Sequence, residues 1–239
     1  VPEFGRTRPR PVGLWQVPGI WIVPAPLGGP PRRLTERYAS VRWSPDGKQL
    51  AAIIANPLIG DAVAVAAADG QDERILVPAA GGMHFHHVAW GHDGRHVYYS
   101  RTLEPNHSLG EIDRVPVSGG APEVVVRTEG TAMFPAPTPD GRALIYAGDH
   151  GGQGLNIWWR PLDGSPERRR TTGAGEFTEP FISRDGHHVV MLARRRRGSL
   201  VRVGVDDGAK SALQAVGDGD ADPSIAPATG RIFVTSRRS

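Results

Sequence analysis

The sequence predicts an all-β protein, folded as a β-propeller of four-stranded antiparallel blades, and two repeated features support this. A tight glycine turn recurs at residues 47, 94, 141, 186 and 230, at spacings of 47, 47, 45 and 44 residues. A second glycine-containing hairpin lies between successive turns, as in "AADGQDERIL" and "PVSGGAPEVV". Each period therefore holds four short strands, which is the content of one propeller blade.

The composition agrees with this fold class. The chain has 239 residues, of which 31 are Gly and 22 are Pro, the residues that most often form turns. Its apolar runs are too short to span a membrane, so we expect no membrane insertion. The chain has no cysteine, which excludes disulfides and thiolate metal sites.

The two ends of the chain predict how the ring closes. Residues 19–36 match the second half of a blade and residues 223–239 match the first half. We therefore expect five blades, most simply closed by pairing of the N- and C-terminal half-blades, which removes open sheet edges. The alternative is that the sequence is an excerpt of a larger propeller. We expect the sequence to be a segment of a longer chain.

The expected domain boundaries follow from the same repeats. Residues 1–18 form an N-terminal extension or linker, and residues 19–239 form a single propeller domain. The internal blades are expected at about 41–85, 88–132, 135–177 and 180–220, and the composite blade combines 221–239 with 19–40.

The turn "WSPDGK" has a structural explanation. Pro45 presets its own φ, and Gly47 supplies the positive φ of a tight reversal. Asp46 is placed to accept backbone N–H groups within the turn. Trp43 and Trp90 precede their turns and are expected to pack between blades. We therefore expect no catalytic role for the turn aspartates.

These elements resemble a known family. "SVRWSPDGKQLAAI" followed by the "IWxVPxxGG" pattern is similar to the TolB-like, WD-related propeller repeat, from about residue 19 onward. The last copy departs from it, with Ala228 and Thr229 before Gly230. The resemblance implies the fold and little about function. Proteins of this kind include periplasmic partners of envelope lipoproteins, sensor domains and peptidase accessory domains, so the resemblance favours a periplasmic or extracytoplasmic location.

Candidate ligand-binding residues precede each turn glycine by seven positions, on the loops expected just before the innermost strands. Polar groups from every blade would converge there, at the axial mouth of the ring. In the last copy, alignment on the preceding proline gives Asp222. His86, which is adjacent to His87, is added to the set. The predicted site residues are Ser40, His86, His87, Phe134, Glu179 and Asp222. Neighbouring positions expected on the same loops are Tyr38, His84, Met133, Glu176, Thr178 and Asp220.

The histidines of "HFHH" raise the question of a metal. His84 and His86 would share one face of a strand, and an imidazole with a carboxylate suits a first-row divalent ion. The alternative is a set of polar loop residues, because no HExxH-like spacing is present. The pectate-fragment lyases that resemble this family hold a metal by histidine, but their pattern does not match residue by residue. The metal therefore remains open, and we expect no other cofactor.

The remaining motifs bear on function. The chain has no Gly-x-Ser-x-Gly elbow and no phosphate-binding loop, so we assign no catalytic residue. The net charge is +3, but the arginine clusters at 168–170, 194–197 and 237–238 fall on different parts of the rim, so we expect no nucleic acid partner. We predict a monomeric, non-catalytic binding or scaffold propeller that presents a face to a protein or glycan, as in a sensor domain of a larger bacterial protein. The alternative is a metal-assisted lyase or hydrolase acting at the axial channel mouth.

Overall fold

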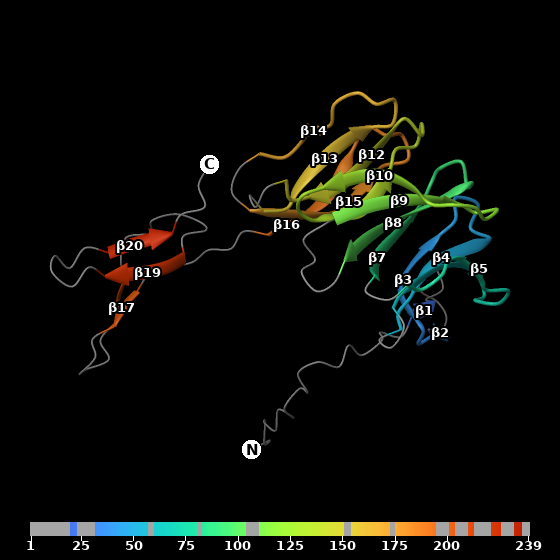
Figure 1. Ribbon diagram of the computed structural model, residues 1–239, viewed down its shortest axis with the longest axis horizontal. Coiled ribbons are helices and arrows are strands. Elements are labelled where there is room, and N and C mark those ends of the chain that lie inside the picture. Colours follow the sequence, from blue (N-terminus) through green and yellow to red (C-terminus); the bar gives the residue numbers. More distant parts are fainter. Residues whose placement is uncertain are drawn as a thin grey trace, which may run out of the picture.

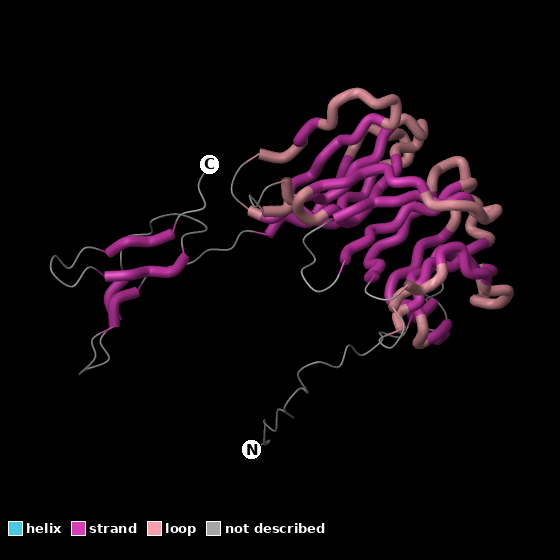
Figure 2. The backbone as a smooth tube through the Cα atoms, viewed as in Figure 1, coloured by secondary structure: helices cyan, strands magenta, loops and turns pink. Residues whose placement is uncertain are grey.

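The described elements of the chain are all β-strands. The computed structural model describes residues 20–22, 32–56, 60–80, 83–103, 110–150, 154–172 and 175–194, and the backbone of 201–203, 210–212, 221–225 and 232–235. Strands linked by short turns account for the regular structure in these ranges (Figure 2). The all-β class is therefore confirmed.

Three four-stranded antiparallel sheets form the body of the described structure (Figure 1). In each one the strands lie side by side in chain order. The first blade is β3 (Tyr38–Trp43), β4 (Gln49–Ile54), β5 (Ala62–Ala67) and β6 (Arg74–Val77). The second is β7 (Met83–Trp90), β8 (His96–Leu103), β9 (Gly110–Pro116) and β10 (Glu123–Thr128). The third is β11 (Ala132–Pro137), β12 (Ala143–Gly148), β13 (Asn156–Pro161) and β14 (Arg168–Arg169).

The other strands form two-stranded sheets. They are β1 (Ile20–Ile22) with β2 (Arg32–Thr35), β15 (Glu176–Ile182) with β16 (Val189–Arg194), β17 (Val201–Val203) with β18 (Lys210–Ala212), and β19 (Ala221–Ile225) with β20 (Ile232–Thr235). The expected pairing of residues 19–36 with 223–239 is not among these described sheets. Four-stranded blades are thus confirmed, whereas the number of blades and the closure of the ring stay predictions.

The inner turns have the predicted chemistry. Ser44 Oγ donates to Asp46 Oδ1 (2.7 Å), and the Lys48 N–H donates to the same oxygen (3.1 Å). The bond from Ser44 and then the bond from Lys48 lower the pKa of Asp46. Gly47 has the positive φ that the reversal needs, 71°. The same bonds recur around Asp140 and Asp185, so these carboxylates stabilise turns.

Hydrophobic clusters join each blade to the next. Ile53 of β4 and Tyr99 of β8 belong to one cluster, through which the first blade packs against the second. Tyr98 of β8 and Leu144 of β12 belong to another, between the second and third blades. A further cluster joins the third blade to β15 and β16. The core therefore lies between the sheets, as face-to-face packing of apolar sheet surfaces requires.

The two turn tryptophans differ in environment. Trp90 is buried, and its indole N–H donates to the Arg42 carbonyl oxygen across the first two blades (3.0 Å). Its predicted packing between blades is confirmed. Trp43 is 49% exposed, so the same prediction was wrong for it. Its side chain instead lines a surface groove.

A β-bulge interrupts every described innermost strand. The register shifts between Tyr38 and Ser40 in β3, and in β7, β11 and β15 at the corresponding place. In the last three, two residues face one on the partner strand, which bends the strand and increases its twist. The strands continue through these bulges, so all four begin before the expected blade boundaries at 41, 88, 135 and 180. The ring residues were predicted to lie on loops, and this is corrected: they lie within strands.

Candidate functional site

The bulges set the direction of two predicted site residues. Phe134 and Glu179 occupy equivalent positions and have φ values of 55° and 53°, in the left-handed region. Non-glycine residues are uncommon there, at a cost of about 1–2 kcal/mol each. Pro135 and Pro180 follow them, and proline is tolerated at bulges because it need not donate to the ladder. The bulge thereby changes the direction of both side chains.

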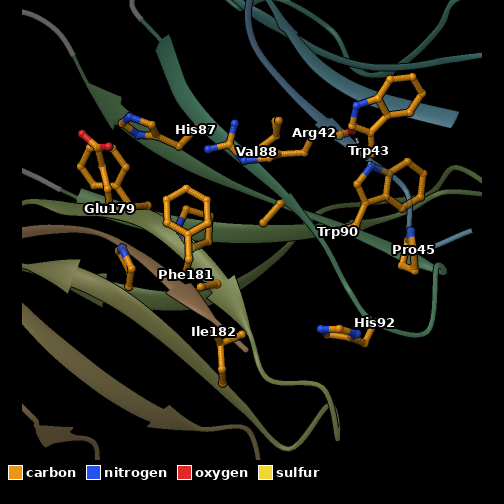
Figure 3. A pocket seen from close by; sticks show the side chains of 15 residues that line it. Arg42, Trp43, Pro45, His87, Val88, Trp90, His92, Glu179, Phe181 and Ile182 are labelled. Atoms are coloured by element: carbon orange, nitrogen blue, oxygen red, sulfur yellow. Dashed lines mark hydrogen bonds between the residues drawn. The ribbon is translucent and has the colours of Figure 1, made fainter. Parts of the chain in front are cut away.

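These side chains line a groove of about 260 Å³ between the innermost strands (Figure 3). Its walls come from β3, β7, β11, β15 and the turns that follow β3 and β7. The lining residues are Arg42, Trp43, Pro45, His87, Val88, Ala89, Trp90, His92, Phe134, Pro135, Ala136, Glu179, Pro180, Phe181 and Ile182. The groove is thus largely apolar and aromatic, with a few polar groups, which is the usual character of a ligand site.

Three of the six predicted site residues meet in this groove, namely His87, Phe134 and Glu179. The imidazole of His87 packs on the ring of Phe134 from the next blade, with centroids 3.8 Å apart and planes inclined by 38°. Glu179, from β15, lines the same groove (Figure 3). Residues from three successive repeats thus line one groove, and their role in ligand binding stays a prediction.

The other three predicted site residues lie elsewhere. Ser40 is half-buried in β3 and does not line the groove. His86 Nε2 lies 3.0 Å from Thr102 Oγ1, so its ring turns toward β8 and away from the groove. Both were predicted to lie with the other site residues at the axial mouth. The bulge explains their separation from the groove because it changes which side chains face it. Asp222 is in β19, and its side chain lies outside the described residues.

The neighbouring positions have structural contacts or lie outside the groove. Tyr38 donates its hydroxyl to Glu73 Oε2 (2.8 Å) within the first blade. His84 Nδ1 lies 3.4 Å from Asp61 Oδ2, which links the first blade to the second. Met133, Glu176 and Thr178 are in strands but do not line the groove. Asp220 lies outside the described residues.

Sequence reasoning missed a second set of groove residues. Each lies five positions before its turn glycine, two beyond the predicted ring: Arg42, Ala89, Ala136 and Phe181. The signal was present, because alternate residues of a strand share a face. It was missed because the ring residues were placed on loops, where this alternation does not apply. Two of these residues, Arg42 and Phe181, are exposed.

His87 is the most perturbed group of the groove. Burial, followed by the charges of His86 and Arg42, lowers the pKa of His87 to about 3. Its imidazole is therefore neutral at neutral pH. The Nδ1 atom is buried and has no hydrogen-bond partner among the described residues. A buried polar atom without a partner costs about 1–3 kcal/mol, so His87 is the group that gains most from a ligand with a matching donor or acceptor.

The described residues contain no group of three or more His, Cys, Asp or Glu side chains that could hold a metal ion. His84 and His86 stack with ring centroids 6.5 Å apart, but their polar contacts are with Asp61 and Thr102. Within the described residues, the metal site that the sequence left open therefore gains no support. Within them, too, no helix has the length and apolar character that crossing a bilayer requires.

Acid should destabilise the fold through His87. The folded-state pKa is depressed, so the stabilising contribution is complete above the unfolded value of about 6.5 and falls as pH drops toward 3. In urea titrations at pH 7, 5 and 4, the free energy of unfolding of the wild type should fall by up to about 1.4 kcal/mol per pH unit more than that of His87→Asn. His92→Asn, in the same groove but exposed, is the control. A constant difference between wild type and His87→Asn at all three values would contradict this.

Comparison with known proteins places this geometry in a wider context. No protein-family model matches the sequence, and no curated protein matches it either. Similar solved structures include putative TolB from Agrobacterium tumefaciens, with a TM-score of 0.63, 20% identity, and 81% of this chain and 73% of that chain covered. TolB from Acinetobacter baumannii has a TM-score of 0.63, 18% identity, and coverage of 87% and 51%.

A puromycin-hydrolyzing peptidase from Mycobacterium tuberculosis is also similar, with a TM-score of 0.52 and 19% identity. The match covers 86% of this chain and 40% of that chain. Likeness at such low identity establishes a shared fold and no shared activity. The repeat pattern, the four-stranded blades and the two TolB structures agree. The chain therefore has the TolB-like β-propeller fold.

Proposed function

We propose that this protein is a non-catalytic binding or scaffold propeller, and that its groove holds a segment of a partner protein. The observation that carries the proposal is a pair of exposed aromatic side chains on the groove. Trp43 is 49% exposed and Phe181 is 55% exposed, and they lie on β3 and β15, at opposite ends of the run of innermost strands. Exposed aromatics at a concave apolar surface are the usual anchors of protein recognition.

A protein segment fits the groove chemistry better than a glycan does. Proline, valine and isoleucine side chains form much of the wall, and such surfaces favour apolar side chains over hydroxyl-rich sugars. The volume of about 260 Å³ suits one or two anchoring side chains, with the rest of the segment lying across the surface. The TolB likeness supports the fold on which this proposal rests. The protein itself is proposed to be monomeric.

Binding should depend on the two exposed aromatics. A peptide-display selection on the immobilised wild type gives the probe, and its Kd is then measured by fluorescence titration. Trp43→Ala and Phe181→Ala should each raise Kd about tenfold, with little change in Tm because both side chains are exposed. Trp21→Ala is the matched control, because Trp21 is 56% exposed but lies outside the groove.

Two outcomes would overturn the proposal. One is a selected peptide whose Kd is unchanged in both groove variants and raised in Trp21→Ala. The other is binding of oligosaccharides on a glycan array, sensitive to the same two groove variants, with no peptide selected.

A second function has one observation in its favour. A half-buried histidine of strongly lowered pKa, with a carboxylate in the same cleft, is typical of general acid–base sites. The alternative from the sequence, a metal-assisted lyase or hydrolase acting at the axial channel mouth, would use His87 and Glu179 in these roles. Turnover of an ester or polysaccharide substrate that His87→Asn abolishes would favour it over the binding module.

We also propose that β19, β20, β1 and β2 together form the fifth blade and close the ring. Ile20 and Leu34 of β1 and β2 pack on the open face of the first blade, where the outer half of such a blade would lie. At the other end, Val190 of β16 is 71% exposed, whereas the equivalent Ile145 of β12 is 2% exposed beneath the next sheet. A missing neighbour on β16 is what an unclosed ring would leave.

A further inference from the structure

One end of the groove gathers its polar groups. Arg42, His87 and Glu179 lie near one another there, whereas the turn residues Pro45 and His92 lie at the other end (Figure 3). The Arg42 side chain extends from β3 toward β15, and its guanidinium carbon lies 5.8 Å from the centroid of the Phe181 ring. Arg42 also contributes to the lowered pKa of His87, which places its charge close to that imidazole.

The two charges at this end are not neutralised by ion pairs among the described residues. Neither Arg42 nor Glu179 forms one there, although other arginines of the blades do, such as Arg101 with Asp113 (3.2 Å). The hydrogen bond of the Arg42 guanidinium is to the carbonyl of the preceding residue (2.9 Å). Most of its five donors therefore remain available, and both carboxylate oxygens of Glu179 remain available as acceptors.

The neutral imidazole of His87 adds a third polar group at this end of the groove. His87 Nδ1 is buried without a partner among the described residues, so it can pair with either a donor or an acceptor, according to tautomer. A purely anionic ligand would meet Glu179, and a purely cationic ligand would meet Arg42. Each would place like charges together, which disfavours binding.

We propose that this end of the groove recognises a dipolar peptide segment, with an acidic group held by Arg42 and a basic group held by Glu179. The inference rests on the proposed function and names its partner class. Arg42 offers the planar fork that pairs with a carboxylate in two parallel hydrogen bonds. The apolar residues between the two charges pack on Phe181 and Phe134, and His87 bonds the main chain of the segment.

Blocked peptides with a Pro-Leu-Phe core and different flanking charges are the probes. The set contains Asp–core–Lys, Lys–core–Asp, Asp–core–Asp, Lys–core–Lys and an uncharged Ser–core–Ser. Binding is followed by the fluorescence of Trp43 and Trp90, which line the groove. One of the two dipolar peptides should bind at least about tenfold more tightly than Asp–core–Asp, Lys–core–Lys and Ser–core–Ser. This difference in affinity should decrease at high salt.

Charge exchange makes the test specific. Arg42→Glu and Glu179→Lys should each weaken the preferred dipolar peptide about tenfold or more. Arg42→Glu should then prefer Lys–core–Lys, and Glu179→Lys should prefer Asp–core–Asp. Arg95→Glu, an exposed arginine outside the groove, is the control. Unchanged Tm values verify that the variants fold.

The failures of the two proposals are distinguishable. Equal binding of all five peptides, unaffected by charge exchange but lost in Trp43→Ala, overturns the dipolar inference and leaves the binding module standing. Tightest binding of Asp–core–Asp or Lys–core–Lys by the wild type also overturns it. If no peptide binds, and the peptide selected by display is insensitive to every groove variant, both proposals fall.

Discussion

Replacing Gly130 by alanine is expected to lower the free energy of unfolding by about 4 kcal/mol or more, the range of the most damaging substitutions. A Cβ at this position would lie 1.7 Å from the backbone oxygen of Asp149. The contact is with main chain, so no side-chain rotation relieves it. Gly130 also accepts a hydrogen bond from the Gly110 N–H (2.6 Å), where the second blade connects to the third. Relief of the clash would therefore separate the two blades.

Urea unfolding of Gly130→Ala and of a matched glycine variant tests this expectation. Gly164 has a φ of 87°, but a Cβ added there would meet no heavy atom within 4 Å. Gly164→Ala therefore carries only the cost of a left-handed alanine, about 1–2 kcal/mol. Equal losses in the two variants would mean that the junction between the second and third blades tolerates a methyl group, contrary to the close approach seen here.

Removing residues 232–239 is expected to lower Tm by about 10 °C or more, if β20 closes the ring. The deletion removes β20, one of two inner strands of the proposed fifth blade, and leaves both β1 and the exposed face of β16 without a neighbour. Terminal deletions ordinarily cost little unless the segment is held in a sheet. About 3–4 kcal/mol corresponds to this shift for a chain of this size.

Thermal unfolding of the deletion is compared with that of a chain lacking residues 1–18, the predicted extension, which should retain the Tm of the full chain. Labelling adds a local measurement, because the chain has no cysteine of its own. Val190→Cys should react slowly with a thiol reagent in the full chain and rapidly in the deletion. Val124→Cys, on the outer strand β10 and 41% exposed, should react rapidly in both. Rapid labelling of Val190→Cys in the full chain would contradict closure.

The repeat architecture could be predicted from the sequence because its determinants act over a few residues. Asp46 and Gly47 form their turn with Ser44 and Lys48, all within five positions. The alternation of apolar residues sets the strands, and the glycine spacing sets the period. None of these features depends on contacts between distant repeats, so the order of residues along the chain is enough to reveal them.

The candidate site was predicted in part. His87, Phe134 and Glu179 were found because equivalent positions of stacked repeats meet at the axis. The pair that gives the groove its exposed charge and aromatic surface, Arg42 and Phe181, was missed. Strand alternation could have placed each of them beside the predicted site residues. Their contact, between residues 139 positions apart, depends on how the sheets pack and could not be predicted from the sequence.

The all-β class, the four-strand repeat and the turn chemistry can be predicted from the sequence, because each follows from short-range steric and hydrogen-bonding preferences. Which of the predicted site residues reach the groove depends on the tertiary structure. The bulges turn Phe134 and Glu179 inward at positive φ but leave His86 bonded to Thr102. Likewise, His87 is buried by the ring of Phe134 from another blade, and this burial is the main cause of its lowered pKa. Side-chain direction and desolvation depend on how the sheets pack face to face, and packing between repeats is a property of the folded molecule.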